Sequence, residues 1–432
     1  MKYFFQTAIL LSVFFSVSCA SVSMSIFPES RYISADFAGV AHAGSSGTQE
    51  ELDYLNYIGV NWVLHTFNWH RIEPNQGEWD FSGYDDLVNF TASAGIKVIG
   101  ILAYDNWWIH DEKRAKRYVP PERLPDYLEY VRKTVEHFRG RVDAWCIWNE
   151  PDTRRFWTGP DEEFFELSRR AAEVVRETDS EVILLGGAFT SGVMGLSKKF
   201  IRGFFESGAM NKVDAVAFHP YELNPSRSLL LNERFRKIVA DYGFADKIWI
   251  TEVGYPTGGR YPTKINEKKL PEYVLKTWVL LAASGSEKIV WYQMFDPLNR
   301  SSKNSEHFFG LVRSSDDYTS KGAEAFRLSA KYLSDSICYV QVPERDGLPG
   351  NIPKSLRIFW FKRADGGTLV LWKEGLGSRQ VRLQLPGTNH LRHDIVLGGA
   401  DSIPAETAIN AGRVPVFITW QGSEEKPKIS VE

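Results

Sequence analysis

Two glutamates carry the clearest chemical signal in this sequence, because each one follows a short apolar run. Glu150 comes after the run 143–148, and Glu252 comes after the run 247–251. Runs this short and this rich in large apolar residues indicate buried strands. Pro151 cannot continue a central strand, so the first of these strands ends near Glu150. The sequence therefore predicts two carboxylates at the tips of two strands.

A pair of facing carboxyl groups can cleave a glycosidic bond. One group protonates the departing oxygen, and the other attacks the anomeric carbon or activates water. A separation of roughly 5–5.5 Å between them would mean a covalent intermediate and retained stereochemistry. We therefore expect Glu150 and Glu252 to be the catalytic residues of a glycosidase, provided that the fold brings them together.

The elements that must position these glutamates alternate between strand and helix from residue 34 to residue 334. Eight strands alternating with helices are typical of parallel pairing, and they predict a (β/α)8 TIM barrel of the α/β class. The expected strands are 36–41, 60–67, 97–103, 143–148, 181–186, 213–218, 247–251 and 288–294. A barrel gathers all strand C-termini at one face, where active sites lie. An open doubly wound sheet is the alternative, although no glycine-rich phosphate loop follows the first strand.

The character of the chain changes after about residue 337, where short β-type runs separated by glycine and proline turns begin. The expected strands are 356–362, 368–372, 379–385, 394–397 and 414–420. They predict a small C-terminal antiparallel β-sandwich over residues 337–425, followed by a polar tail that frays. The sandwich would be either a structural cover on the barrel's flank or a carbohydrate-binding module.

The first twenty residues have the features of a secretion signal. Lys2 supplies the positive end, and residues 3–17 form an apolar segment too short to span a bilayer comfortably. Residues 18–20 offer a small-residue cleavage site, and Cys19 is also placed as in a bacterial lipoprotein box. We expect an exported protein, either extracellular or periplasmic, or anchored to a membrane through a lipid on Cys19.

The composition excludes several other classes of function. The formal net charge is -3, with 51 Lys and Arg against 54 Asp and Glu, so nothing favours nucleic acid as a partner. The three cysteines, Cys19, Cys146 and Cys338, lack metal-ligand spacing, and we expect neither a metal nor a cofactor. The 14 tryptophans and 18 tyrosines suit both a large core and a groove that stacks sugar rings. The oligomeric state stays open.

Several motifs together resemble one group of known enzymes. Asn149-Glu150 after an aromatic strand, with Glu252 ending a second strand, is similar to the retaining glycoside hydrolases of clan A, whose catalytic glutamates follow strands four and seven. The further motifs that fall where the clan has them are Asn68-Trp-His-Arg-Ile-Glu-Pro-Asn-Gln-Gly-Glu-Trp-Asp-Phe81, Gly95-Ile-Lys-Val, Phe218-His-Pro-Tyr221 and Trp291. Family 39-like enzymes are the nearest match, and some of these act on bacterial exopolysaccharides.

The resemblance implies a role for each matching residue. Glu150 would be the general acid/base, and Glu252 the nucleophile, kept ionised by hydrogen bonds. Asn149 would hydrogen-bond the sugar 2-OH. The residues that would orient the nucleophile and line the sugar site are His219 and Tyr221, with Trp291 as the floor under the sugar ring. The implied function is a secreted or surface-anchored retaining β-glycosidase that hydrolyses an oligo- or polysaccharide.

Further aromatic side chains lie in loops on the active face. Trp69 and Trp107 follow the second and third expected strands, and His42 follows the first. Each of them would either contact sugar or pack the loops. Two other functions stay open on the sequence alone. One is a non-catalytic carbohydrate-binding protein on a glycosidase scaffold, and the other is a different barrel enzyme such as an aldolase, for which Lys247 and Lys288 are poorly placed because they open strands.

Overall fold

The computed structural model describes residues 27, 30–44, 47–110, 116–190, 197–260, 264–340, 353 and 355–431. The predicted signal segment 1–20, with Cys19, lies outside the described residues. Among the residues that are described, no helix has both the length and the apolar composition needed to cross a membrane.

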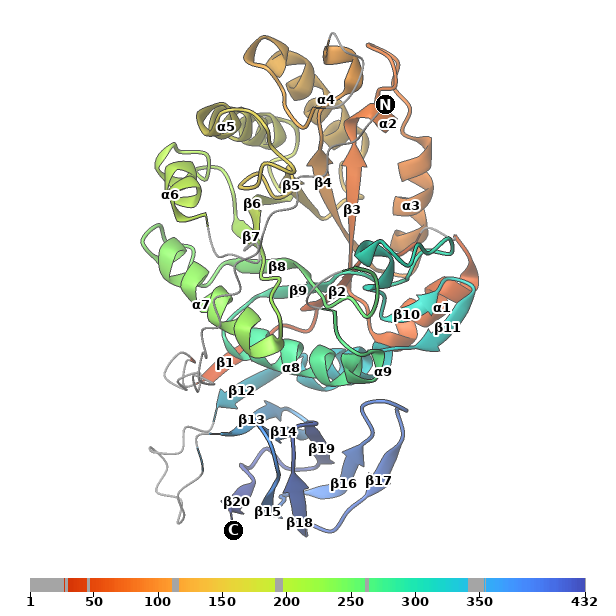
Figure 1. Ribbon diagram of the computed structural model, residues 1–432, viewed down its shortest axis with the longest axis vertical. Coiled ribbons are helices and arrows are strands. Elements are labelled where there is room, and N and C mark those ends of the chain that lie inside the picture. Colours follow the sequence, from red (N-terminus) through yellow and green to blue (C-terminus); the bar gives the residue numbers. More distant parts are fainter. Residues whose placement is uncertain are drawn as a thin grey trace.

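The central element is a closed barrel of eight parallel strands, which confirms the predicted fold class (Figure 1). The strands are β2 (Ala38–Ala41), β3 (Trp62–Asn68), β4 (Lys97–Ala103), β5 (Ala144–Ile147), β6 (Ile183–Thr190), β7 (Ala215–His219), β8 (Ile248–Val253) and β9 (Lys288–Trp291). Each strand pairs in parallel with the next along the chain, and β9 closes the ring onto β2. The last strand ends at Trp291 instead of continuing to residue 294.

Helices surround the barrel and follow its strands. They are α1 (Gln49–Ile58), α2 (Trp69–Ile72), α3 (Ser82–Ser93), α4 (Leu124–His137), α5 (Asp161–Thr178), α6 (Lys198–Glu206), α7 (Pro225–Ala240), α8 (Leu270–Ala283) and α9 (Ala323–Leu333). Their ends follow the capping rules. Thr48 accepts a hydrogen bond from the Glu51 amide at the start of α1, and Gly59 ends that helix with φ at 80°.

The loops on the active face contain short 3-10 turns and one β-hairpin. They are the 3-10 turns η2 (Trp107–Ile109), η3 (Pro121–Arg123), η4 (Glu267–Lys269) and η5 (Ser305–Phe308), and the hairpin β10 (Val312–Ser314) and β11 (Asp317–Ser320). The turns η2 and η5 come after β4 and β9, respectively. They therefore build the rim of the barrel mouth.

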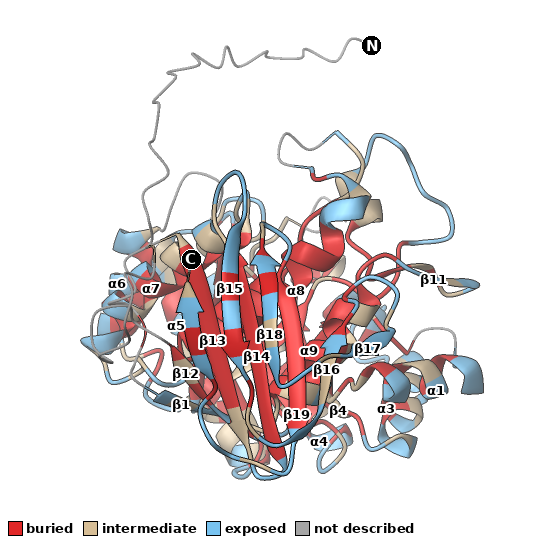
Figure 2. Cartoon of the chain, turned by 90° about the horizontal axis from the view of Figure 1, so that it is seen from below, coloured by how far each residue is buried: buried red, intermediate tan, exposed pale blue. Residues whose placement is uncertain are grey.

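The C-terminal part is a two-layered antiparallel sandwich. Its larger sheet has the order β1 (Ser30–Ile33), β12 (Ser336–Val340), β13 (Leu356–Arg363), β14 (Gly366–Lys373), β19 (Val416–Gln421), β16 (Thr388–His393) and β17 (Ala400–Ser402). Its smaller sheet has the order β18 (Glu406–Ala411), β15 (Arg379–Gln384) and β20 (Lys428–Val431). In Figure 2 the smaller sheet shows alternating buried and exposed bands, as a sheet with one solvent face should.

The central strands of the larger sheet, β13, β14 and β19, are buried on both faces, because they pack against the small sheet on one side and against the barrel helices on the other. In β13, Ile358 and Trp360 join the sandwich core, whereas Phe359 and Phe361 belong to the barrel core. The two-residue period of a strand explains this division. Consequently every residue of α8, the helix that this sheet covers, is buried. The sandwich is fastened to the barrel through a shared apolar core.

Three details differ from the expectations for the sandwich. Residues 394–397 form a turn, because Asp394 caps the backbone amides of Val396 and Leu397. The tail does not fray, since β20 pairs with β15 up to Val431. On the other side, Ser30–Ile33 pairs with β12, so the sandwich takes its first strand from before the barrel.

Candidate active site

Glu150 is delivered to the barrel mouth by a sharp turn after β5. Trp148 and Glu150 both have positive φ, 65° and 47°, which is costly for residues other than glycine. The turn is held because the buried Trp148 indole donates to the Phe156 carbonyl at 2.8 Å. The Glu150 amide also donates to the carbonyl of Ala188, at 3.0 Å. These contacts fix the direction of the Glu150 carboxyl group.

Glu252 lies on the inner side of β8 and is buried. The Tyr221 hydroxyl donates a hydrogen bond to its Oε2 at 2.9 Å. Tyr221 stands just beyond the end of β7, the neighbouring strand. The structure therefore brings Tyr221 to the place from which it can orient Glu252.

His219, the last residue of β7, joins the two glutamates. Its Nδ1 is 3.0 Å from Oε1 of Glu150 and 3.7 Å from Oε2 of Glu252, and its Nε2 is 2.9 Å from the Thr251 hydroxyl. One donor atom from each of the three groups lies within 4.8 Å of the other two. The two carboxyl groups thus face each other at the short separation that double displacement requires.

Burial and charge together set the proton affinities of this trio. Burial and the nearby charge of Glu150 raise the pKa of Glu252 to about 7, although His219 and the Tyr221 hydrogen bond pull it down. Burial thus opposes the ionised form of Glu252 that the hydrogen bond from Tyr221 and the neighbouring His219 favour. Burial lowers the pKa of His219, but the charge of Glu252 and the contact with Glu150 outweigh it and raise this pKa overall.

Asn149 lies beside the pair and is almost fully buried. Its side chain hydrogen-bonds the hydroxyl of Tyr104, the residue that follows β4. Its Oδ1 atom is buried without a hydrogen-bond partner. A buried acceptor with no partner is uncommon in proteins. A hydroxyl group of a bound ligand would satisfy it, which fits the role that the motif implies.

Trp291 does not offer a face to the barrel mouth. Its side chain is 0% exposed, and its indole nitrogen donates to the Phe309 carbonyl at 3.3 Å. The next residue, Tyr292, is partly exposed and lies 6.4 Å from the Tyr221 ring. We therefore correct the predicted role of Trp291 from sugar floor to packing, and Tyr292 is the neighbouring residue whose ring is partly exposed. Successive side chains near a strand end point to opposite sides of the sheet. A prediction that is wrong by one residue therefore places a core residue in the site.

The remaining predicted contacts divide in the same way. Trp69 is fully buried, stacks on Tyr130 and donates to Glu73 at 2.7 Å, so its predicted role in sugar binding is corrected to packing. Trp107 is half-buried in η2 on the rim. His42 lies 5.5 Å from the Tyr292 ring. His42 and Trp107 thus lie near the barrel mouth, and nothing in the structure tests whether either of them contacts a sugar.

Sequence reasoning missed four residues of the site, namely Thr251, Glu306, Tyr104 and Tyr292. Tyr104 and Tyr292 directly follow β4 and β9, and Thr251 precedes Glu252 in β8, so an inspection of every polar or aromatic residue near a strand end would have found these three. Glu306 comes from η5 in a long loop, and its carboxyl accepts the Tyr292 hydroxyl hydrogen bond at 3.2 Å. Nothing in the local pattern around Glu306 signals this position.

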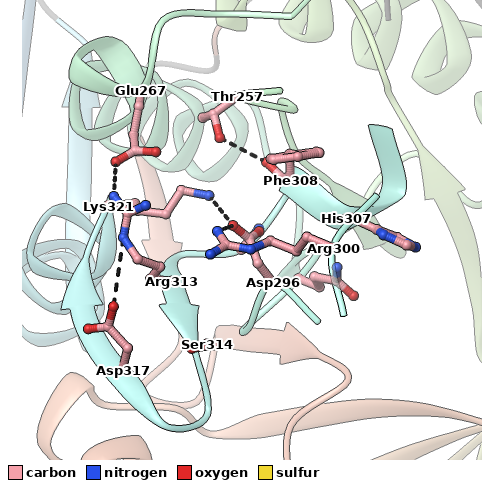
Figure 3. A network of polar contacts seen from close by, with 12 residues as sticks. Thr257, Glu267, Asp296, Arg300, His307, Phe308, Arg313, Ser314, Asp317 and Lys321 are labelled. Carbon is pink, nitrogen blue, oxygen red and sulfur yellow. Dashed lines mark hydrogen bonds and ion pairs between the residues drawn. The ribbon is translucent and has the colours of Figure 1, made fainter. Parts of the chain in front are cut away.

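A cavity of about 730 Å³ adjoins the site on the side of Tyr292. His42, Gln293, Asp296 and Glu306 are among the residues that line it. The ammonium of Lys321 points at the Asp296 carboxylate, 2.8 Å away, and both side chains are almost fully buried (Figure 3). Since breaking a buried pair is costly, this contact fixes the start of the loop that walls the cavity.

The trio could also bind a cation by its donor atoms alone. Glu150, His219 and Glu252 are a cluster of metal-type ligands among the described residues. However, hydrogen bonds already occupy both ring nitrogens of His219. A metal ion would have to displace the contact between His219 and Glu150. The donors are therefore accounted for by hydrogen bonding within the site.

Comparisons with known proteins agree with this geometry. A family model described as beta-galactosidase, of glycoside hydrolase family 42, matches residues 42–107. Beta-glucosidase 25 of Oryza sativa subsp. japonica is 26% identical over 107 residues, which are 24% of this chain and 21% of that protein. The chain thus spans about a fifth of the length of the curated relatives it matches.

Solved structures extend the likeness to nearly the whole chain. A family 39 glycoside hydrolase from Bacteroides cellulosilyticus WH2 superposes with a TM-score of 0.72 at 17% identity, covering 90% of this chain and 82% of the other. A family 39 beta-xylosidase from Caulobacter crescentus gives a TM-score of 0.60 at 14% identity, covering 92% and 97%. Together with the family model, these matches confirm the predicted resemblance to clan A and the nearness to family 39 in fold.

Proposed function

We propose that this chain is a retaining β-glycosidase that works by double displacement. The single observation that carries the proposal is the placement of Glu150 and Glu252, with one donor atom of each within 4.8 Å of the other and of His219. Carboxyl groups this close leave no room for a water molecule attacking from the opposite face, as inversion would need. The glycosidases among its relatives support the same reaction class.

In the first step, Glu252 attacks the anomeric carbon and Glu150 protonates the departing oxygen. The glycosidic C–O bond breaks, and an ester bond forms between the sugar and Glu252. In the second step, Glu150 takes a proton from water, the water oxygen attacks the anomeric carbon and Glu252 leaves as a carboxylate. The proton that Glu150 lost is thereby restored, so the enzyme ends as it began.

His219 and Thr251 determine which groups of the site carry protons before the first step. One proton shared along the 3.0 Å contact between Glu150 and His219 leaves Glu252 as the carboxylate of the pair. If His219 carries a hydrogen on Nε2, the Thr251 hydroxyl accepts it at 2.9 Å, and Nδ1 is free to accept the Glu150 proton. Tyr221 holds the Oε2 atom of Glu252, so the other carboxyl oxygen is the nucleophilic atom.

The substrate in this proposal is a β-linked oligo- or polysaccharide. The partly exposed ring of Tyr292 lies beside Tyr221 at the carboxyl pair, and sugar C–H faces pack on such rings. The cavity next to Tyr292 would take a further part of the saccharide. Export, a lipid on Cys19 and a bacterial exopolysaccharide as substrate remain parts of the proposal that rest on the sequence alone.

The experiment uses the full chain with 4-nitrophenyl β-xyloside, β-glucoside and β-galactoside. Separate Glu150→Gln and Glu252→Gln variants should each lose nearly all hydrolysis, and NMR of early products should show the β-anomer first. Undiminished hydrolysis by either variant would refute the proposal. Binding of saccharides without any turnover by the unmodified chain would favour a non-catalytic carbohydrate-binding protein, against which the short carboxyl separation now speaks.

A further inference from the structure

An arginine that makes no ion pair with any of the described residues stands on the Glu150 side of the barrel mouth. The guanidinium of Arg117 lies over the Tyr104 ring, with its carbon 3.7 Å from the ring centroid. Tyr104 in turn stacks on Phe156, with centroids 5.8 Å apart and planes 18° apart. Within the described part of the chain, no carboxylate is within 4.0 Å of the Arg117 guanidinium.

The backbone presents Arg117 rigidly. Asp105, which is fully buried, accepts the Arg117 amide at 3.0 Å and also pairs with His110 at 2.8 Å. The Arg117 carbonyl accepts the Thr158 amide at 3.0 Å, from the loop that follows Glu150. Arg117 itself has φ at 58°, a strained value for this residue type. A loop pinned from both sides at such a cost holds one side chain in one place.

The stacked geometry leaves the chemistry of the guanidinium available. Stacking occupies a planar face, whereas the five N–H donors point outward in the plane. Two parallel donors of this kind match the two oxygens of a carboxylate. The charges of Glu150 and Glu252 both act on Tyr104, the residue that Arg117 covers. These two carboxylates would repel an anion bound there, and the positive charge of Arg117 offsets that repulsion.

The position also says which part of the substrate would meet Arg117. Tyr104 follows β4 and Phe156 follows β5, whereas Glu252 and Tyr292 come from β8 and β9. In a closed ring of eight strands, β4 and β5 lie across from β8 and β9. Since Glu150 protonates the departing oxygen, the leaving group must lie on the β4–β5 side. The cavity beside Tyr292 is on the opposite side.

We propose that Arg117 binds a carboxylate on the leaving-group part of the saccharide, so that the natural substrate is an acidic glycan with a uronic acid or similar unit at that position. This inference rests on the proposed glycosidase function and adds the substrate class to it. Tyr104 and Phe156 support the guanidinium of Arg117 from below, and its outward-pointing donors fix the carboxylate of the sugar unit. A neutral sugar unit would leave the N–H donors of Arg117 bound to water alone, so the site prefers a sugar unit that carries a carboxylate.

The test uses two matched leaving groups on one sugar. The probes are 4-carboxyphenyl and 4-carbamoylphenyl β-xyloside and β-glucoside, which have nearly the same shape and differ in charge. The ratio of kcat/KM for the carboxyphenyl over the carbamoylphenyl member of a pair should be roughly tenfold higher in the unmodified chain than in Arg117→Gln, the size expected of a charge-assisted hydrogen bond. Comparing this ratio between variants cancels the intrinsic difference in leaving-group ability of the two phenols. Arg117→Lys, which keeps the charge but loses the fork, should lie between.

Arg155→Gln is the matched control. Arg155 lies over Phe156 at 5.1 Å, but its side chain is 71% exposed and is 3.8 Å from Glu306, so its removal should leave the ratio unchanged. Because the readout is a ratio, a general loss of activity in any variant cancels, and thermal melting checks that each variant is folded. Calorimetric binding of the same pairs gives the preference without turnover.

The outcomes separate the two proposals. Hydrolysis with the same ratio in Arg117→Gln as in the unmodified chain overturns the role of Arg117 and leaves the glycosidase function standing. Binding that prefers the carboxylate and depends on Arg117, but without hydrolysis of any pair, supports the anion site and refutes the glycosidase. Absence of both binding and hydrolysis for every pair refutes both.

Discussion

The barrel mouth and the interface between the two sandwich sheets differ in the kind of side chain that they bury. The mouth buries Glu252, His219 and part of Glu150, and it holds Trp148 and Glu150 at positive φ. The interface between the sandwich sheets is an apolar cluster that contains residues such as Ile358, Leu369 and Ile418. Burying charge and straining the backbone both lower stability, whereas burying apolar surface raises it.

The comparison teaches where stability originates in this chain. Some of the polar contacts that join barrel and sandwich lie at α8, where Glu272 pairs with Lys276 and with Arg413, each at 2.9 Å. They sit beside Trp372, whose ring lies 5.5 Å from the Lys276 ammonium. The charges there are paired one against another, whereas the mouth brings two carboxylates together around a single histidine. The charges at the mouth therefore lower the stability of the fold, and the apolar cores of the barrel and the sandwich offset this cost.

The sharpest way to break this comparison is Glu252→Gln. We expect kcat/KM to fall by about 10⁴-fold or more, because the nucleophile is lost. We also expect the variant to be more stable than the unmodified chain at pH 8, by roughly 2 kcal/mol, because it buries an amide instead of a charge. Chemical denaturation at pH 8, with kinetics on the same samples, measures both. A variant less stable at pH 8 would show that the charge on Glu252 is stabilising.

The sign of that stability change follows from linkage. The folded pKa of Glu252, about 7, is above the 4.5 of a free glutamate, so the folded state holds this proton more tightly than the unfolded state. The contribution of Glu252 to stability is therefore most favourable below the unfolded pKa and declines as pH rises to about 7. The advantage of the glutamine variant should accordingly shrink between pH 8 and pH 5.

Ile418→Ala tests the other region. Ile418 is fully buried between the two sandwich sheets, so the truncation should cost about 2–5 kcal/mol of unfolding free energy through lost burial and a cavity. Activity per folded molecule at 20 °C or below should stay within twofold of the unmodified chain. Urea unfolding monitored by tryptophan fluorescence, with initial rates before and after, checks both. Large loss of activity without unfolding would mean that the sandwich contributes directly to the site.

The pH profile sharpens the description of the mouth. Since attack requires the Glu252 carboxylate, kcat/KM should fall about tenfold per pH unit below the raised pKa of about 7. A control substrate with a better leaving group, such as a dinitrophenyl glycoside, should keep the same acidic limb because that limb belongs to the nucleophile. An acidic midpoint near 4 to 5 would instead mean that substrate binding or His219 restores the ordinary affinity of Glu252 for its proton.

The smallest expected effect is that of Thr251→Val, which keeps the shape of the side chain and removes its hydroxyl. Without the acceptor for Nε2 of His219, the histidine loses its tautomeric preference, and we expect kcat to fall about tenfold or less with little change in KM. The position of the pH limbs should also move. A variant with an unchanged profile and unchanged kcat would reduce Thr251 to a packing residue. Thr251→Ser, which keeps the hydroxyl, is the matched control.

Much of the fold could be read from local patterns. The eight barrel strands were predicted close to their observed positions, because each is a short apolar run between a helix end and a loop. The sandwich was less complete, since the exposed strand β17 and the half-exposed strand β18 were missed, and the 394–397 run looked like a strand but forms a turn. Exposed strands depend on their partners for their conformation, and no local signal states who those partners are.

The amino-acid sequence by itself determined the alternation of strand and helix and the placing of Glu150 and Glu252 at strand tips, because apolar periodicity and proline act locally. Only the tertiary structure decided that Tyr292 and not Trp291 faces the mouth, that His219 bridges both carboxyl groups, and that Arg117 stands over Tyr104. These facts depend on the exact strand ends, on burial and on loops pinned from distant residues. Such long-range constraints have no short-range signature in the chain.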